Sequence, residues 1–288
     1  MSNVDLLTVP LSTLILLIVI GLCAGLITGV MGGSGVSVVV PILIVFMGFS
    51  VLQAIGTSLF VDIVASVVAS FTYHQHGNVD LSHGLWMALA AVIGAQFGSF
   101  FAHSTPASGL AFFFAAFLII NGAYIMKAGM RSITERASGF ARRRLYAGLD
   151  QSTMKKRAGA LSVLFGLGIG IISGFVGAGG GLLFLLVLLL VLGYEPHIAI
   201  GTSTLIMAIT ATSAATSYYL LGNLDIVAAL IISAGTILTS RIGAVAANKL
   251  GQDILGRVIA LILIVLGIVA LGSGRSRVGL ATGQGKIA

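Results

Sequence analysis

The five residues AIGTS stand at positions 54–58 and again at positions 199–203, an interval of 145 residues. Sliding the chain by this interval aligns its two halves without a gap. The longer stretches that then coincide are GVMGGSGVS (29–37) with GFVGAGGGL (174–182), and GNVD (77–80) with GNLD (222–225). A repeat of this length predicts that the molecule is built from two copies of one structural unit.

The composition is that of a membrane protein. The chain has 288 residues, of which 58% are hydrophobic and only 8% are charged, and its mean hydropathy is +1.13. Soluble domains carry about 25% charged residues. Residues 6–61 and 81–126 contain no Asp, Glu, Lys or Arg, and a transmembrane helix needs about 20 apolar residues. We therefore expect an all-α polytopic membrane protein.

Each copy has the same order of elements: one span, a glycine cluster, a short apolar stretch and three further spans. The expected spans are 11–31, 52–74, 82–103 and 107–127 in the first copy and 158–176, 198–220, 225–248 and 254–273 in the second, with the short stretches at 37–48 and 182–193. The short stretches are too short to cross a bilayer alone. Glycine-broken backbone at membrane depth needs protein or water to satisfy its polar groups. We expect glycine-broken or re-entrant helices there.

These boundaries divide the chain into four parts. The parts are a first transmembrane repeat (1–126), a basic loop (127–157), a second transmembrane repeat (158–273) and a C-terminal tail (274–288). The basic loop has nine Lys or Arg residues against one Glu and one Asp, and the positive-inside rule places such a loop in the cytoplasm. Its position therefore argues against binding to nucleic acid.

The charge pattern also predicts that the two copies are inverted in the membrane. The loop at 102–108, expected outside, has no Lys or Arg, whereas Lys249 and Arg257 lie at the corresponding turn of the second copy. Inversion requires an odd number of crossings per copy, so each broken helix counts as one crossing. We expect a multi-pass protein of the cell (inner) membrane with both termini outside.

The glycine clusters are the first candidate binding site. Broken helices at the bilayer midplane are typical of secondary transporters, whose half-helix N-termini bind anionic groups. The candidates are Gly32, Gly33, Ser34 and Gly35 in the first copy and Gly177, Gly179, Gly180 and Gly181 in the second. The alternative is that these glycines only allow close helix packing.

The hydroxyl groups of the repeated GTS are further candidates. Thr57, Ser58, Thr202 and Ser203 are expected where hydrophobic helices begin. There they could donate hydrogen bonds to an anion. Capping of the free N–H groups of their own helices is the alternative.

Two charged residues lie clearly within the expected spans, and ionisable groups in spans indicate function. The repeat places Asp62 opposite Met207 and Arg241 opposite Gln96. We expect Arg241 and Gln96 to donate to substrate; for Arg241 the alternatives are snorkelling to the inner surface or pairing with Asp62. Asp62 is a candidate for coupling to protons or is merely the partner of Arg241.

The sequence offers little for catalysis, a metal or a cofactor. It contains no HExxH, GxSxG, P-loop or CxxC pattern. Since Asp62 is the only carboxylate clearly within a span, a metal site is disfavoured. We expect no enzymatic activity, no metal and no cofactor.

The doubled glycine break, the following AIGTS and the GNVD or GNLD turn resemble the TauE/SafE family of sulfite exporters over residues 11–273. The resemblance implies a permease, expected to export sulfite or related small organosulfur anions, with both glycine clusters and both Thr-Ser pairs at the site. The first cluster departs from the second, and only the second copy has Arg241. A passive anion channel, a cation or metal permease and a membrane scaffold or receptor component are the alternatives. The expected partners are the sulfur oxyanion and the lipid bilayer, and a homo-oligomer is possible.

Overall fold

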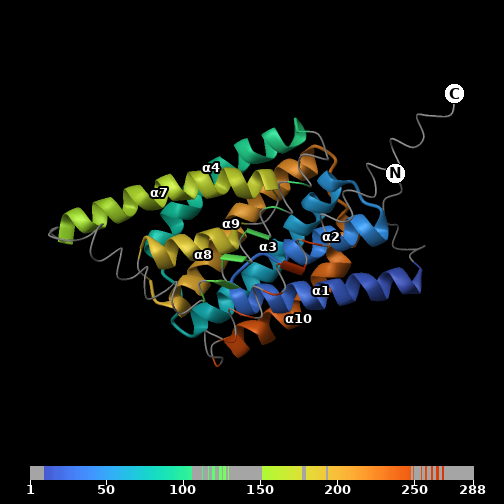
Figure 1. The fold of residues 1–288 in the computed structure, drawn as a ribbon, viewed down its shortest axis with the longest axis horizontal. Helices are drawn as coiled ribbons and strands as arrows, with labels where there is room; N and C mark the ends of the chain where they lie inside the picture. Colours follow the sequence, from blue (N-terminus) through green and yellow to red (C-terminus); the bar gives the residue numbers. More distant parts are fainter. Residues whose placement is uncertain are drawn as a thin grey trace.

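A computed structural model describes residues 10–105, 151–176, 180–192 and 194–247, with isolated positions between 112 and 129 and between 249 and 268. Its elements, labelled in Figure 1, are α1 (Leu11–Met31), α2 (Val36–Met47), α3 (Val51–Gln75), α4 (Leu81–His103), α7 (Gln151–Val176), α8 (Gly181–Leu190), α9 (Pro196–Leu220) and α10 (Ile226–Ala247). All regular secondary structure in these ranges is helical. The expected all-α class is confirmed.

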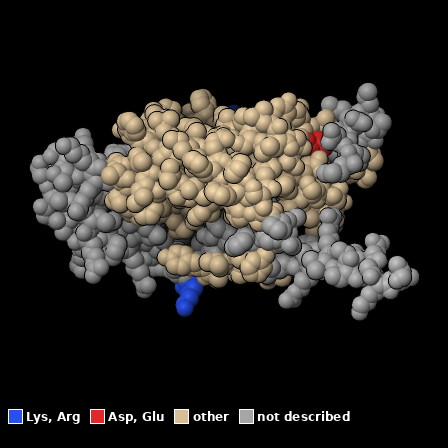
Figure 2. Space-filling view, turned by 90° about the horizontal axis from the view of Figure 1, so that it is seen from above, with Lys and Arg blue, Asp and Glu red and all other residues tan. Residues whose placement is uncertain are grey.

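Six of these helices are long and apolar enough to cross a membrane: α1, α3, α4, α7, α9 and α10. Large apolar side chains cover their outward faces; Trp86 is 60% exposed and Leu164 is 65% exposed. The described part of the face in Figure 2 carries hardly any charged side chain. Exposed apolar surface of this extent is costly in water and favourable in lipid. The protein is therefore a multi-pass membrane protein.

The helices α2 and α8 are the short elements that follow the glycine clusters. They have 12 and 10 residues, which at 1.5 Å per residue gives lengths of about 18 and 15 Å. A hydrocarbon core is about 30 Å thick. Neither helix can span it alone, as the sequence predicts.

The first helix of each repeat packs against the last described helix of the other repeat. Thus α1 lies along α10 and α4 lies along α7 (Figure 1). A Cβ atom on Gly25 would lie 2.6 Å from the Thr236 carbonyl oxygen, and one on Gly170 would lie 2.3 Å from that of Ala91. The repeat interval relates these two contacts. Small residues allow such close backbone approach between membrane helices.

The central helices α3 and α9 lie side by side and run antiparallel. Gly56, near the start of α3, packs against Asn223 in the turn after α9, while Gly201, near the start of α9, packs against Asn78 in the turn after α3. Tyr73 and Tyr218, near the ends of these helices, are both buried and donate to the carbonyl oxygens of Gly29 and Gly174, at 2.9 and 3.2 Å. Inverted repeats predict this antiparallel arrangement.

The helix boundaries follow the expected ones with local differences. Helix α7 begins at Gln151 instead of 158, so the end of the basic segment is helical, and α8 ends at Leu190 instead of 193. The expected spans at 107–127 and 254–273 lie outside the described residues, apart from isolated helical positions. The tail at 274–288 also lies outside them.

Candidate functional site

The glycine clusters break the chain between a long helix and a short one in both repeats. Helix α1 ends at Met31 and is followed by Gly32, whose φ of 60° lies in the left-handed region that glycine adopts without strain. Helix α2 then begins after Gly35. In the second repeat, Gly180 has a φ of 69° and directly precedes α8. Gly177 and Gly179 lie outside the described residues.

The two breaks meet in the interior of the molecule. A Cβ atom on Gly181 would lie 2.7 Å from the carbonyl oxygen of Gly32 and 3.1 Å from the Cα atom of Gly33. The Ser203 hydroxyl lies 3.2 Å from the Gly32 carbonyl oxygen and 2.8 Å from that of Ile200, so it donates to both. The described glycines of both clusters are buried. The two repeats thus build one central region.

Asp62 occupies the N-terminus of α2. Its side chain comes from α3 and is fully buried. It accepts a hydrogen bond from the backbone N–H of Gly35 at 2.9 Å and another from the hydroxyl of Ser34. The first N–H groups of a helix have no partner within the helix and carry partial positive charge, so a carboxylate is stabilised there. The N-terminus of α2 is therefore already occupied by an acidic side chain of the protein itself.

The corresponding position beside α8 is occupied by methionine. A Cβ atom on Gly181 would lie 2.6 Å from Sδ of Met207, which the repeat interval pairs with Asp62. In the part of the chain that the structure describes, no side chain accepts a hydrogen bond from the first turn of α8. The two breaks are therefore alike in backbone but different in charge.

The GTS residues do not open their helices. Helix α3 begins at Val51, after Ser50, whose hydroxyl accepts from the Gln53 N–H, and α9 begins at Pro196. The GTS residues were predicted to lie at the helix starts, but both helices begin more than one turn before them. Ser58 donates to the carbonyl oxygen of Ile55 within α3, at 2.8 Å.

The threonines of GTS bind the turn of the opposite repeat. Thr57 Oγ1 accepts from the N–H of Asp225 at 3.0 Å, and Thr202 Oγ1 accepts from the N–H of Asp80 at 2.9 Å. Each Asp in turn caps the helix that follows it: Asp225 accepts from the N–H of Ala228 at the start of α10, and Asp80 does so at the start of α4. These contacts give Thr57 and Thr202 a structural role between the repeats.

Gln96 lies on the α4–α9 contact. Its amide nitrogen donates to the carbonyl and hydroxyl oxygens of Ser213, at 2.9 and 2.7 Å, and its amide oxygen accepts from Ser217. The side chain is exposed, whereas the described glycines of the breaks are buried. Gln96 therefore joins two helices at the surface.

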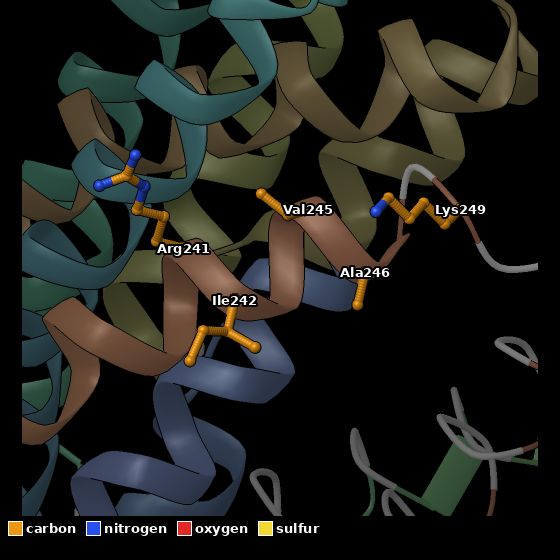
Figure 3. Close-up of a pocket in the computed structure, with 5 residues that line it drawn as sticks. All are labelled: Arg241, Ile242, Val245, Ala246 and Lys249. Carbon is orange, nitrogen blue, oxygen red and sulfur yellow. The ribbon is translucent and has the colours of Figure 1, made fainter.

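Arg241 is exposed on α10. It lines a shallow hollow of about 390 Å³ with Ile242, Val245, Ala246 and Lys249. Arg241 and Lys249 stand at opposite ends of this hollow, with Val245 between them (Figure 3). Among the described residues no ion pair joins Arg241 to Asp62, whose carboxylate accepts hydrogen bonds from Ser34 and Gly35.

Sequence reasoning missed three residues at the breaks: Thr28, Ser173 and Met207. The hydroxyls of Thr28 and Ser173 are buried, and neither has a hydrogen-bond partner within the described parts of the chain. The signal that could have found all three was the repeat itself, since it aligns Thr28 with Ser173 and Asp62 with Met207. The described residues contain no group of three His, Cys, Asp or Glu side chains that could hold a metal ion.

Comparison with known proteins places this architecture in one family. Residues 17–270 match the family model for the sulfite exporter TauE/SafE. Two relatives in Bacillus subtilis (strain 168) are each 24% identical: Probable membrane transporter protein YunE, with 90% of this chain and 98% of the relative aligned, and Probable membrane transporter protein YdhB, with 89% and 99% aligned. No solved structure matches. The chain therefore belongs to the TauE/SafE family and is a membrane transporter.

Proposed function

We propose that the protein is a secondary transporter that exports sulfite or related small organosulfur anions across the cytoplasmic membrane. The observation that carries this proposal is Asp62 at the N-terminus of α2. There a buried carboxylate is held by one backbone N–H group and one hydroxyl. Sulfite and sulfonates also present negatively charged oxygens, which the same kinds of donor stabilise.

The arrangement of the two repeats supports a transporter mechanism. Two broken helices meet at the centre, and α3 and α9 run antiparallel between them. We infer that the repeats are inverted, because an in-plane pseudo-two-fold axis relates such antiparallel copies. The basic loop 127–157 then lies in the cytoplasm and both termini lie outside. The description of the family as a sulfite exporter supports sulfite as the substrate and export as the direction of transport.

The contact between the breaks favours a carrier over a passive channel. The backbone of Gly181 lies directly against Gly32 and Gly33, and the surrounding residues are buried. An anion that passes this point must separate the two breaks. A carrier does so once per transport cycle, whereas a channel keeps a path open. The membrane transporters among its relatives likewise support transport over an enzymatic role.

Transport by the purified protein tests this proposal. The protein is reconstituted in proteoliposomes, and entry of radiolabelled sulfite is measured with and without a pH gradient. We expect saturable uptake that protein-free liposomes lack. Uptake equal to that of protein-free liposomes for sulfite and for simple sulfonates, by correctly inserted protein, would contradict the proposed substrate class.

A further inference from the structure

The two helix N-termini at the breaks are not equivalent, and this difference points to a single anion site. The α2 end already holds Asp62, while the α8 end has Met207 at the corresponding place. We propose that the transported anion binds at the N-terminus of α8, where it displaces the Met207 side chain and accepts hydrogen bonds from the first turn of α8 and from Ser173. This inference rests on the proposed function and assigns its substrate site.

The N-terminus of α8 has backbone N–H groups that could bind an anion. Gly180 precedes the helix in a left-handed conformation and provides no side-chain cap. Among the described residues, no hydrogen bond is made by the N–H groups of residues 181–183, which open the helix; the N–H of Phe184 donates to the carbonyl oxygen of Gly180. Helix N-termini bind oxyanions because the first N–H groups have no partner within the helix and this end carries a partial positive charge. Met207 is flexible and unbranched, so its side chain can move aside.

Ser173 supplies a second and independent observation. This side chain is 1% exposed, and its hydroxyl has no hydrogen-bond partner among the described residues. It lies against the helix start, since a Cβ atom on Gly180 would be 3.2 Å from Cβ of Ser173. Buried hydroxyls are normally paired, and in helices they usually bond to a carbonyl one turn back. A hydroxyl left unpaired here is available to donate to a ligand.

Thr28 shows which feature distinguishes the two ends. It corresponds to Ser173, is also buried with no partner in the ranges that the structure describes, and its Oγ1 lies 3.1 Å from the position of a Cβ atom on Gly35. Each break therefore has an unpaired hydroxyl beside its N-cap glycine. In the described part of the molecule, only the α2 end has a carboxylate as well. Thr28 is thus the matched control for Ser173.

The charges at the breaks favour an anion with a single negative charge. Residues 28–36 and 173–190 contain no Lys, Arg or His. A helix N-terminus contributes only about half an elementary charge, and Asp62 lies at the adjoining break. Hydrogensulfite and monoanionic sulfonates need less compensating charge than sulfate. We therefore expect methanesulfonate to compete with sulfite and sulfate to compete poorly.

Placing a carboxylate beside α8 tests the site directly. Met207→Asp copies the arrangement at α2, so the new carboxylate should occupy the helix end and exclude substrate. We expect its affinity for radiolabelled sulfite, measured on purified protein, to fall about tenfold or more, which corresponds to about 1.4 kcal/mol. Met207→Asn, which lacks the charge, should lose less. Gel filtration shows whether each variant is folded.

A second pair of variants decides the matter if Met207→Asp does not fold. Ser173→Ala should lower sulfite affinity several-fold, whereas Thr28→Ala should bind as the wild type does. Equal affinity of Ser173→Ala and the wild type, or equal losses in both variants, would overturn the α8 site. Sulfate that competes as well as methanesulfonate would overturn the single-charge requirement. Wild-type protein that moves no sulfur anion would contradict the proposed function itself.

Discussion

At the scale of single residues, Asp62 is the carboxylate that holds the first break together. It is fully buried, and a buried carboxylate is costly unless it is hydrogen-bonded. The N–H of Gly35 and the hydroxyl of Ser34 supply those bonds and join α3 to the start of α2. Sequence reasoning identified Asp62 as a functional candidate. It could not identify the partners, because they lie 27 and 28 residues away along the chain.

Removing the Asp62 carboxylate should loosen the first break. In Asp62→Ala the N–H of Gly35 and the hydroxyl of Ser34 lose their acceptor in a buried place, which costs about 1–3 kcal/mol per unsatisfied group. We expect a lower thermal unfolding midpoint in detergent, with Asp62→Asn in between because its amide oxygen still accepts. A midpoint for Asp62→Ala equal to that of the wild type would show that these bonds do not stabilise the break.

The exposure of Arg241 separates it from the buried breaks. Sequence reasoning gave it a place at the substrate, with snorkelling as an alternative, and its exposed position in a surface hollow that Lys249 also lines favours the alternative. We expect Arg241→Gln to bind sulfite within about twofold of the wild-type affinity, a difference under 1 kcal/mol. Calorimetric titration measures this directly. A tenfold loss of sulfite affinity would show that Arg241 belongs to the binding site.

At the scale of elements, each GTS helix receives the GNVD or GNLD turn of the other repeat. The contact has no room for a side chain: a Cβ atom on Gly56 would lie 1.9 Å from the Asn223 carbonyl oxygen, and one on Gly201 would lie 2.0 Å from that of Asn78. The AIGTS stretch of each repeat thus packs against the GNVD or GNLD turn of the other repeat, and this contact is formed twice.

Alanine at either glycine should therefore destabilise the protein to a similar extent. Gly56→Ala and Gly201→Ala each force a backbone shift, and overpacking of this kind typically costs about 1–3 kcal/mol. Thermal unfolding of the purified protein checks this. The control is Gly168→Ala on the exposed face of α7, where a Cβ atom would meet nothing within 4 Å and the better helix propensity of alanine should stabilise slightly. Unequal losses at Gly56 and Gly201 would contradict the equivalence of the two contacts.

The sequence predicted the order and type of the elements because hydrophobic length and glycine clusters are local signals. It misplaced the GTS residues relative to the helix starts, since uniformly apolar flanks contain little information about where a helix begins. Ser50 is the actual cap of α3. The roles of Thr57 and Thr202 could not be predicted from either half alone, because each side chain binds the opposite repeat.

At the scale of the whole molecule, the repeats interlock so that neither has a complete core by itself. Helix α1 packs on α10, α7 packs on α4, and α3 lies along α9, so each of these contacts joins the two repeats. The repeat interval relates the α1–α10 contact to the α4–α7 contact. In the α3–α9 contact the two helices are themselves equivalent, and they run antiparallel. Antiparallel copies of this kind should place equivalent loops on opposite sides of the membrane.

Cysteine accessibility tests that inverted orientation. Cys23 lies in α1 as an exposed free thiol, so it is first replaced by alanine. Single cysteines at Ser138, in the basic loop, and at Ser276, in the C-terminal tail, should then differ: an impermeant maleimide in intact cells should label only Ser276→Cys. Labelling of both positions, or of Ser138→Cys alone, would contradict the proposed topology.

The most direct test of the central claim, that this protein is a carrier for small sulfur anions, is counterflow in proteoliposomes. Vesicles are loaded with a high concentration of unlabelled sulfite and diluted into a trace of radiolabelled sulfite, with the membrane potential held at zero. A carrier exchanges one anion for another, so the label should accumulate transiently above its outside concentration. Label that only equilibrates, at the same rate in loaded and empty vesicles, would contradict a carrier.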